Sequence, residues 1–431
     1  MNLSTPSSLS KNKDKNLYKF IFCIFLFRLL LEFSYVNVMS VSFAYDGYIL
    51  DFNIINYIFS WILYFIALSF VKDRMTKVSD FFFITALLSV VAPITVIYGY
   101  DSSRDLAAVL TLIFSLFFVK FITTFKFISF KKLAIVKNGI SIVVIISLIF
   151  VFFLVIWYFF SGVNFNLNFN KVYDFRADND ELAGIGILRY TNNWTYQIFN
   201  VTLFAIALLH KKYFFAFFIA VIQTYFFAAS AHKIVFFLPF LVLSVWYYFR
   251  QTNSLVALPI SFIFLLIGAL ISLYFSDDLF ISSLIIRRIF FLPANLAFAY
   301  FEFFSFNPKV FWSNGILSSF LSYPYDLSLT HMIGRFIGYD GMGANNGYVS
   351  HGFAHAGYFG VIIYSIILGL LLKLIDDMTY NKLPLWFSIA ISIAPLRTVL
   401  INSDLFTTML THGLFISLII IFLSRSNYDY S

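Results

Sequence analysis

The sequence predicts an all-α, polytopic membrane protein, and both composition and patterning support this prediction. Hydrophobic residues make up 61% of the 431 residues, charged residues only 12%, and phenylalanine alone contributes 60 residues. A water-soluble fold of this length does not need so much apolar surface. The apolar stretches are continuous and not alternating, which is typical of helices that cross a bilayer and excludes a barrel.

Apolar segments of about 20 residues, the length that crosses a hydrocarbon core of roughly 30 Å, divide the chain into about twelve expected spans. Residues 1–431 are expected to form a single integral membrane domain. The first segment is long and lacks a small-residue cleavage site, which predicts an uncleaved anchor. The expected spans lie near residues 17–40, 52–71, 80–100, 106–124, 139–161, 194–209, 213–229, 234–249, 255–275, 357–375, 384–401 and 406–424.

The positions of lysine and arginine predict that both termini lie in the cytoplasm. With this orientation, most of the 29 cationic residues flank the spans on the cytoplasmic side. Cationic flanks resist translocation, so this side should be the inner one. The cytoplasmic charges are scattered over short connectors and form no continuous basic face, so the net charge of +8 predicts no nucleic-acid partner.

Two expected outside loops stand out by their length. Residues 162–193 carry the densest charge cluster of the chain, including Arg176. Residues 276–356 form a large extracytoplasmic loop region before the tenth span, and connectors of this size are usually functional. The stretch Leu279–Phe304 inside it is apolar but interrupted by charges and a proline, which predicts a helix at the membrane interface. The alternative is a thirteenth span, which would invert the topology of everything that follows.

The segment from Gly334 to Gly360 concentrates glycine, asparagine, histidine and Arg335 beside an apolar helix. Backbone that bends tightly and side chains that donate hydrogen bonds are costly next to lipid. Their clustering at a membrane face marks this segment as the candidate site.

The end of this segment resembles a known family. Residues 345–348 (Asn-Asn-Gly-Tyr), followed by residues 357–360 (Gly-Tyr-Phe-Gly), resemble the closing motif of the bacterial oligosaccharide repeat-unit polymerases, the Wzy-type O-antigen polymerases. The number of spans and the two long outside loops are also similar to that family. Further residues that carry the resemblance are Arg287-Arg288-Ile289-Phe290-Phe291-Leu292-Pro293, Tyr300-Phe301-Glu302-Phe303-Phe304, Asn307-Pro308, Trp312 and Tyr323-Pro324-Tyr325.

The resemblance implies polymerisation of undecaprenyl-diphosphate-linked oligosaccharide repeat units into O-antigen or capsular polysaccharide. The glycosyl transfer would take place on the periplasmic face of the bacterial inner membrane, release undecaprenyl diphosphate and use no metal or other cofactor. The lipid bilayer, the lipid-linked oligosaccharide and a protein that regulates chain length would be its partners.

Two other functions stay open. The related O-antigen ligases share the fold and carry a histidine, followed by an amide residue, eleven positions before the Gly-x-x-Gly motif. That position, counted back from Gly357, is Asn346 here, which favours a polymerase. A flippase or transporter of the lipid-linked unit is the second alternative, although short loops and cations inside a central cavity are typical of flippases.

The reaction needs a group that takes the proton of the acceptor hydroxyl. We expect His351 or His355 to do so, since they are four residues apart on one helix face, with Arg335 as a further catalytic residue in the same loop. The two histidines also have metal-ligand spacing. Because the nearest third histidine is His331, we expect no metal site.

The reaction also needs cations, because a diphosphate leaving group gains charge as the anomeric bond breaks. Arg287 and Arg288 are candidates for this role, with snorkelling towards the membrane surface as the alternative. Arg397 follows Pro395 inside an expected span, so it should face the protein interior or a water-filled cavity, with Asp404 as a candidate partner. The expected substrate-binding residues are Arg176, Lys233, Arg287, Arg288, Asn346 and Arg397.

Two of these candidates have a purely structural alternative, and a metal-dependent reaction is a further alternative. Arg176 lies among acidic residues and could form ion pairs within its own loop, and Lys233 could simply end a span. Asp46 and Asp51 leave a metal-dependent reaction open, although neither belongs to a paired acidic motif.

Overall fold

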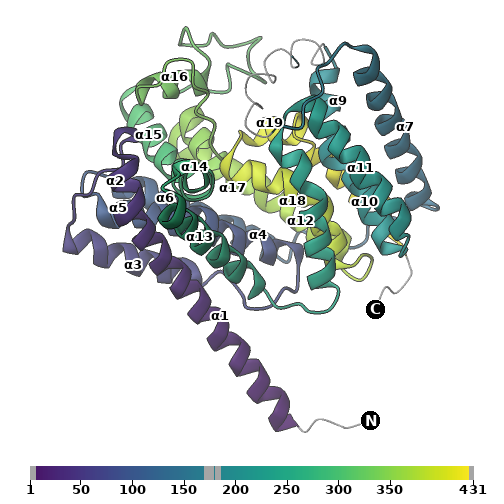
Figure 1. The fold of residues 1–431 in the computed structure, drawn as a ribbon, viewed down its shortest axis with the longest axis horizontal. Helices are drawn as coiled ribbons and strands as arrows, with labels where there is room; N and C mark the ends of the chain where they lie inside the picture. Colours follow the sequence, from purple (N-terminus) through teal and green to yellow (C-terminus); the bar gives the residue numbers. More distant parts are fainter. Residues whose placement is uncertain (1–5, 169–178, 180–185, 427–431) are drawn as a thin grey trace. The chain divides into compact units, whose positions relative to one another are not determined.

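The described part of the chain is helical. A computed structural model describes residues 6–168, 179 and 186–426, and within these ranges the named elements are α-, 3₁₀- and π-helices, with no strand (Figure 1). Among these residues, eight helices are long and apolar enough to cross a membrane. The expectation of an all-α, polytopic membrane protein is confirmed at this level, whereas the count of twelve spans stays a prediction.

The apolar helices follow the expected spans closely. Of the eight long helices found among the described residues, all but Leu279–Phe306 coincide with an expected span. The others are Asn16–Ser42, Val78–Tyr100, Leu106–Thr124, Gly139–Phe160, Tyr213–Ser230, Ala257–Ser276 and Tyr348–Thr379. Shorter apolar helices are α3 (Ile54–Leu68), α12 (Lys233–Phe249), α18 (Leu385–Ile401) and α20 (Leu414–Ser424).

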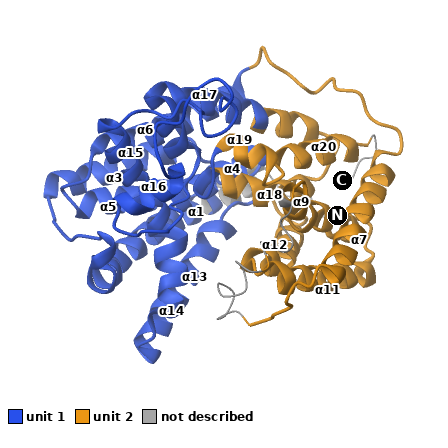
Figure 2. Ribbon diagram, turned by 90° about the horizontal axis from the view of Figure 1, so that it is seen from above, with its two compact units in different colours: residues 1–125, 254–371, 400–404 blue, residues 126–253, 372–399, 405–431 orange. Residues whose placement is uncertain are grey.

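The chain divides into two compact units (Figure 2). Unit 1 holds residues 1–125, 254–371 and 400–404. Within it, α3 packs along α5 and α1 packs along α13. Its helices are α1 (Pro6–Ser34), α2 (Ser40–Ser42), α3, α4 (Val78–Ala86), α5 (Ala92–Tyr100), α6 (Leu106–Thr124), α13 (Ala257–Ser276), α14 (Leu279–Ser282), α15 (Leu292–Phe306), α16 (Leu329–Phe336) and the first part of α17 (Tyr348–Thr379).

Buried tyrosines are prominent in the core of unit 1. Tyr35, Tyr300 and Tyr348 are fully buried, and a buried phenol hydroxyl needs a hydrogen-bond partner. Tyr35 donates to the carbonyl of Ile49 at 2.7 Å, and the hydroxyl of Tyr348 lies 2.8 Å from that of Ser115. These contacts tie helices to segments that are distant in sequence.

Unit 2 holds residues 126–253, 372–399 and 405–431. Its helices pack in sequence, α10 on α11 and α11 on α12, and a buried amide supports them. Gln223 donates to the carbonyls of Tyr196 at 2.7 Å and Val235 at 3.0 Å, which joins three segments through one side chain. Its helices are α7 (Gly139–Phe160), α9 (Leu188–Trp194), α10 (Asn200–Leu209), α11 (Tyr213–Ser230), α12, most of α18, α19 (Leu405–Leu410) and α20, with the last part of α17.

The segment expected to lie at the membrane interface is one continuous helix. It consists of α14, the π-helix η5 (Ser283–Phe291) and α15, and by length and composition it also qualifies as a membrane span. Figure 1 looks nearly along α14 but sees α1 and α13 from the side, so α14 runs across these neighbours in unit 1. A crosswise direction suits an interfacial helix, while the length suits the thirteenth-span alternative.

Cysteine labelling distinguishes these two topologies. Ser276, Asn314 and Asn345 are all exposed, so a cysteine at each can react, in a Cys23→Ser background, with a reagent that does not cross membranes. If α14 to α15 lies at the interface, we expect all three to be labelled in intact cells whose outer membrane has been opened. Labelling of position 276 with protection of 314 and 345 would establish a span instead, and protection of all three would overturn the orientation.

Two expected elements differ from the structure in part. The tenth expected span, 357–375, begins at the kink of α17 at Ala356 and Gly357, but α17 itself begins at Tyr348, so the end of the expected outside loop is also helical. The twelfth, 406–424, is split into α19 and α20 by residues 411–413. Gly413 has φ = 77°, a conformation that glycine adopts without steric cost, and this ends the apolar helix early.

Candidate functional site

A break inside α17 builds the first part of the site. Ala356 (φ = −147°, ψ = 30°) and Gly357 (φ = 60°, ψ = −144°) are not helical, so the carbonyls just before them lose their partners in the helix. The backbone N–H of Val310 donates to the carbonyl of Ala354 at 3.0 Å, and that of Phe311 donates to the carbonyl of His355 at 2.9 Å. Through these two hydrogen bonds the loop after α15 packs against the break, and His355 lies next to this loop.

Both ring nitrogens of His355 have partners. The backbone N–H of Trp312 donates to Nδ1 at 3.2 Å, and Nε2 lies 3.5 Å from Oδ1 of Asp404. Because Nδ1 accepts, the ring proton must reside on Nε2, from which it points at the carboxylate. The indole of Trp312 stacks on the imidazole, with ring centres 5.2 Å apart and an interplanar angle of 18°. His355 is therefore held in one tautomer and one orientation.

Asp404 closes this network from the turn between α18 and α19. Tyr364 donates its hydroxyl proton to Asp404, and the indole N–H of Trp312 donates to the Tyr364 oxygen at 2.8 Å. Burial alone would raise the pKa of the Asp404 carboxyl, but the hydrogen bond from His355, the nearby His351 and the Tyr364 hydroxyl outweigh it and hold that pKa below its usual range. The carboxylate is therefore charged across the physiological pH range.

His351 lies one helical turn before His355 and is buried. Its Nε2 has no hydrogen-bond partner among the described residues. One ring nitrogen each of His351 and His355 and one carboxylate oxygen of Asp404 lie within 4.8 Å of one another, and the ring centre of Tyr300 lies 5.4 Å from that of His351. A buried histidine with an unpartnered nitrogen thus lies beside a charged network.

Three groups this close could hold a metal ion, a reading that the sequence did not favour because it offered only His331 as a third ligand. The missing group is Asp404, which the sequence suggested as a partner of Arg397. A histidine that binds a metal normally keeps its proton on the other ring nitrogen and donates it. His355 accepts a hydrogen bond there, so its geometry is that of a hydrogen-bonded His–Asp pair.

A second cluster surrounds Asp46, at the end of the 3₁₀-helix η2 (Ala44–Asp46). Nε of Arg287 lies 2.5 Å from Oδ2 of Asp46, and Tyr339 donates its hydroxyl proton to Oδ1. The amide of Asn295 donates to the backbone carbonyl of Asp46 at 3.1 Å. The hydrogen bond to Asp46, helped by burial, raises the pKa of Tyr339 to about 12, so Tyr339 remains a donor.

Arg104 joins this cluster, although the sequence gave no reason to select it. Its Nε lies 2.7 Å from Oδ2 of Asp101, its NH2 group donates to the carbonyl of Gly47, and its guanidinium lies over the ring of Phe298 at 5.4 Å. The side chains of Arg104 and Arg287 are only 15% and 17% exposed. Arg104 and Arg287, both largely removed from water, thus flank the backbone turn at Asp46 and Gly47, which we call the cationic turn.

Helix α15 connects the two clusters. Its Asn295 bonds Asp46, and its Tyr300 bonds the carbonyl of Ala344 at 3.0 Å and neighbours His351. Asn295 and Tyr300 are five residues apart, which corresponds to a rise of about 7–8 Å along the helix and a rotation of about 140° around it. The Asp46 cluster and the histidine network therefore contact different faces of the same helix.

Arg335 and Arg288 lie on the surface. Arg335 is a last-turn residue of α16, its side chain is 64% exposed, and its Nε lies 3.0 Å from an oxygen of Asp340, which is still more exposed. It therefore shares the glycine-rich turn with Tyr339 but lies outside the buried histidine network. Arg288 is exposed, unlike its neighbour Arg287.

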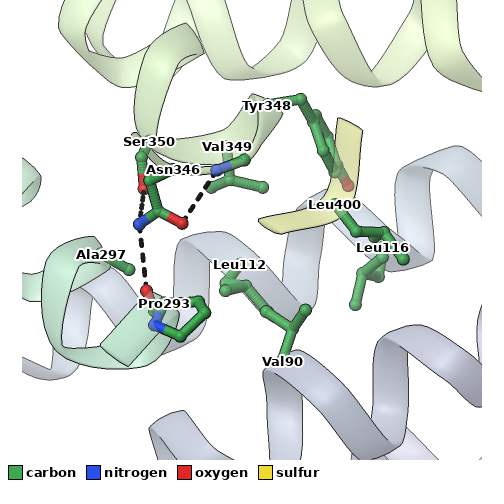
Figure 3. A pocket seen from close by; sticks show the side chains of 11 residues that line it. Val90, Leu112, Leu116, Pro293, Ala297, Asn346, Tyr348, Val349, Ser350 and Leu400 are labelled. Carbon is green, nitrogen blue, oxygen red and sulfur yellow. Dashed lines mark hydrogen bonds between the residues drawn. The ribbon is translucent and has the colours of Figure 1, made fainter. Parts of the chain in front are cut away.

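Asn346 is buried at the start of α17 and its amide is fully used (Figure 3). Nδ2 donates to the carbonyl of Pro293 at 3.0 Å and to Ser350 at 3.1 Å, and Oδ1 accepts the backbone N–H of Gly347 at 2.8 Å. The adjoining apolar cavity of about 20 Å³ has room for about one water molecule. In this conformation Asn346 positions α17 against α15, and a contact with substrate stays a prediction.

The other expected substrate-binding residues lie elsewhere in the chain. Lys233 begins α12, and Arg397 lies half-buried in α18 two residues after Pro395; both belong to unit 2. Arg176 lies outside the described residues. Asp51, a candidate ligand in the metal-dependent alternative, bonds the hydroxyl of Ser102.

Comparison with protein-family models, with curated proteins and with solved structures gives no match. The function must therefore be argued from the site itself.

Proposed function

We propose that the chain is a membrane glycosyltransferase that polymerises undecaprenyl-diphosphate-linked oligosaccharide repeat units. The observation that carries the proposal is that unit 1 holds both the largely buried arginines around Asp46 and the buried histidine network, each in contact with α15. Glycosyl transfer from a diphosphate needs both kinds of group, cations for the leaving group and a base for the acceptor.

The cationic turn suits a diphosphate leaving group. A guanidinium presents several N–H donors in a planar fork that matches phosphate oxygens, and its charge acts more strongly where water is largely excluded. Arg287 and Arg104 meet both conditions. Asp46 and Asp101 neutralise them in the ligand-free protein, so a phosphate group would compete with Asp46 for Arg287.

The histidine network suits the acceptor side of the reaction. As the acceptor oxygen bonds to the anomeric carbon of the donor, the bond from that carbon to phosphate oxygen breaks, and the diphosphate leaves with the electron pair. The acceptor hydroxyl releases its proton, for which the network offers a histidine nitrogen without a hydrogen-bond partner among the described residues, close to a carboxylate.

The buried charges within α1 do not favour the flippase alternative. Such a protein needs cations that face a path for the diphosphate across the membrane. Arg28 is instead fully buried, pairs with Glu32 at 3.5 Å and lies 5.2 Å from the ring of Trp61. Its charge is already stabilised by unit 1.

A purified assay tests the proposal. The protein in detergent is incubated with a synthetic undecaprenyl-diphosphate-linked repeat unit, and products are resolved by size. We expect a ladder of lengthened lipid-linked chains, release of undecaprenyl diphosphate, and activity that persists in EDTA. Folded protein that moves the lipid-linked unit across vesicles without lengthening it would contradict the proposal, and strict dependence on a divalent ion would contradict stabilisation by arginine alone.

A further inference from the structure

We propose that the two histidines of the network have different roles: His351 takes the proton of the acceptor hydroxyl, and His355 is a positioning residue that Trp312 and Asp404 hold in place. This inference rests on the proposed glycosyl transfer. It assigns roles to Trp312, Tyr364 and Asp404, for which the sequence predicted no part in the proton transfer.

His355 lacks a free lone pair. Its Nδ1 accepts the backbone N–H of Trp312, and its Nε2 carries the proton that faces Asp404. A second proton on Nδ1 would face the N–H of Trp312 and break that contact. The ring therefore cannot accept the proton of a substrate without leaving its position.

We assign the ring proton of His351 to Nδ1, which leaves Nε2 as the acceptor. Its Nε2 is buried without a hydrogen-bond partner among the described residues, and leaving a buried polar atom unpaired costs about 1–3 kcal/mol. Functional sites are where such costs are tolerated. The Asp404 carboxylate belongs to the same group of atoms, all within 4.8 Å of one another, so its charge would stabilise the imidazolium that proton transfer creates.

Trp312 is the part of the network that meets solvent. Its side chain is half-buried, and it and Phe311 have φ values of 56° and 47°, a backbone conformation that non-glycine residues adopt at some cost. Two backbone hydrogen bonds, one indole hydrogen bond and the stack on His355 hold this strained turn in place. The exposed part of the indole offers an aromatic face that suits contact with the acceptor sugar ring.

The step balances without a further reactant. The proton leaves the acceptor hydroxyl for Nε2 of His351 while the acceptor oxygen forms its bond to the anomeric carbon, and the diphosphate departs with the electron pair of the broken bond. Asp404 stays charged, and His355 keeps its proton throughout.

Glutamine substitutions separate the two roles. The glutamine in His355→Gln can still accept from Trp312 through its oxygen and donate to Asp404 through its nitrogen, so activity should stay within about tenfold of the unmodified protein, whereas His355→Ala should lose about 100-fold. The glutamine in His351→Gln cannot take a proton, so that variant should lose about 100-fold or more. The control is His331→Gln, an exposed histidine on α16, which should keep full activity.

Each variant is purified, its thermal midpoint in detergent is measured, and chain lengthening of the synthetic lipid-linked unit is followed. A folded His351→Gln protein with activity within threefold of the unmodified protein would overturn the inference, as would a larger loss in His355→Gln than in His351→Gln. Failure of the unmodified protein to lengthen chains would instead contradict the proposed function itself. If His351→Gln does not fold, His351→Asn and recovery of its activity by added imidazole provide the second test, and absence of recovery would count against the assignment.

Discussion

Arg287→Ala is expected to lower the rate of chain lengthening by about 100-fold or more, because a cation that meets developing charge in a poorly hydrated site is worth several kcal/mol of transition-state stabilisation. Arg287 is 17% exposed and already binds a carboxylate, so its position is that of an anion ligand. Arg287→Lys should recover only part of the activity, since an ammonium group lacks the planar fork. The measurement is the assay on the purified variants.

Removal of Arg287 also leaves Asp46, whose side chain is 4% exposed, without its cation, so lost activity could follow from lost stability. The double variant Arg287→Ala/Asp46→Asn removes this unpaired charge and serves as the control. We expect it to recover the thermal midpoint without recovering activity. Full activity in either folded variant would exclude Arg287 from the diphosphate site.

Arg335 provides the comparison with an exposed cation. Its side chain is 64% exposed, so water screens its charge and Arg335→Ala should cost about tenfold or less in rate. Arg335→Lys should restore part of that loss. If Arg335→Ala retains full activity, Arg335 takes no part in the reaction.

Gly347→Ala is expected to destabilise unit 1 by about 2–3 kcal/mol or more, which should lower the thermal midpoint by several degrees. A Cβ at this position would lie 1.8 Å from the carbonyl oxygen of Leu400 and 2.4 Å from its carbonyl carbon. These are backbone atoms, so relief requires a shift of α17 or of the turn that carries Asp404. The variant should therefore also disturb the histidine network.

Gly268→Ala is the matched control for this prediction. A Cβ on Gly268, within α13 of the same unit, would meet nothing within 4 Å. Alanine is the better helix former by about 0.8–1 kcal/mol, so we expect a neutral or slightly stabilised protein. A Gly347→Ala protein as stable as the Gly268→Ala protein would show that the contact with Leu400 relaxes at little cost.

The apolar helices could be predicted from the sequence because their signal is local. Runs of about 20 apolar residues in helical conformation are dictated by length and composition, and the expected segments do coincide with helices. The kink at Ala356 and Gly357 coincides with the expected start of the tenth span, whereas the turn at Gly413 falls inside the expected twelfth span. That turn depends on one glycine with positive φ, which no local pattern distinguishes from a glycine inside a regular helix.

The site could be predicted only in part, for a related reason. The glycine-rich segment with His351 and His355 could be recognised from its polar, glycine-rich composition beside an apolar helix. Asp404 lies 49 positions after His355, and the sequence suggested it only as a partner of Arg397. The pairing of Arg287 with Asp46 joins residues 241 positions apart, and such contacts follow from tertiary packing that no local pattern contains.

The surface glycans of a strain that lacks this gene test the central claim most directly. If the chain polymerises repeat units, flipping and ligation of single units continue, so we predict surface glycan capped with one repeat unit and a return of the full ladder when the gene is restored. Restoration with the His351→Gln or Arg287→Ala variant should leave the single-unit pattern. Accumulation of long carrier-bound chains with none on the final acceptor would identify a ligase and contradict this account, as would single units trapped on the cytoplasmic side, the pattern expected for loss of a flippase.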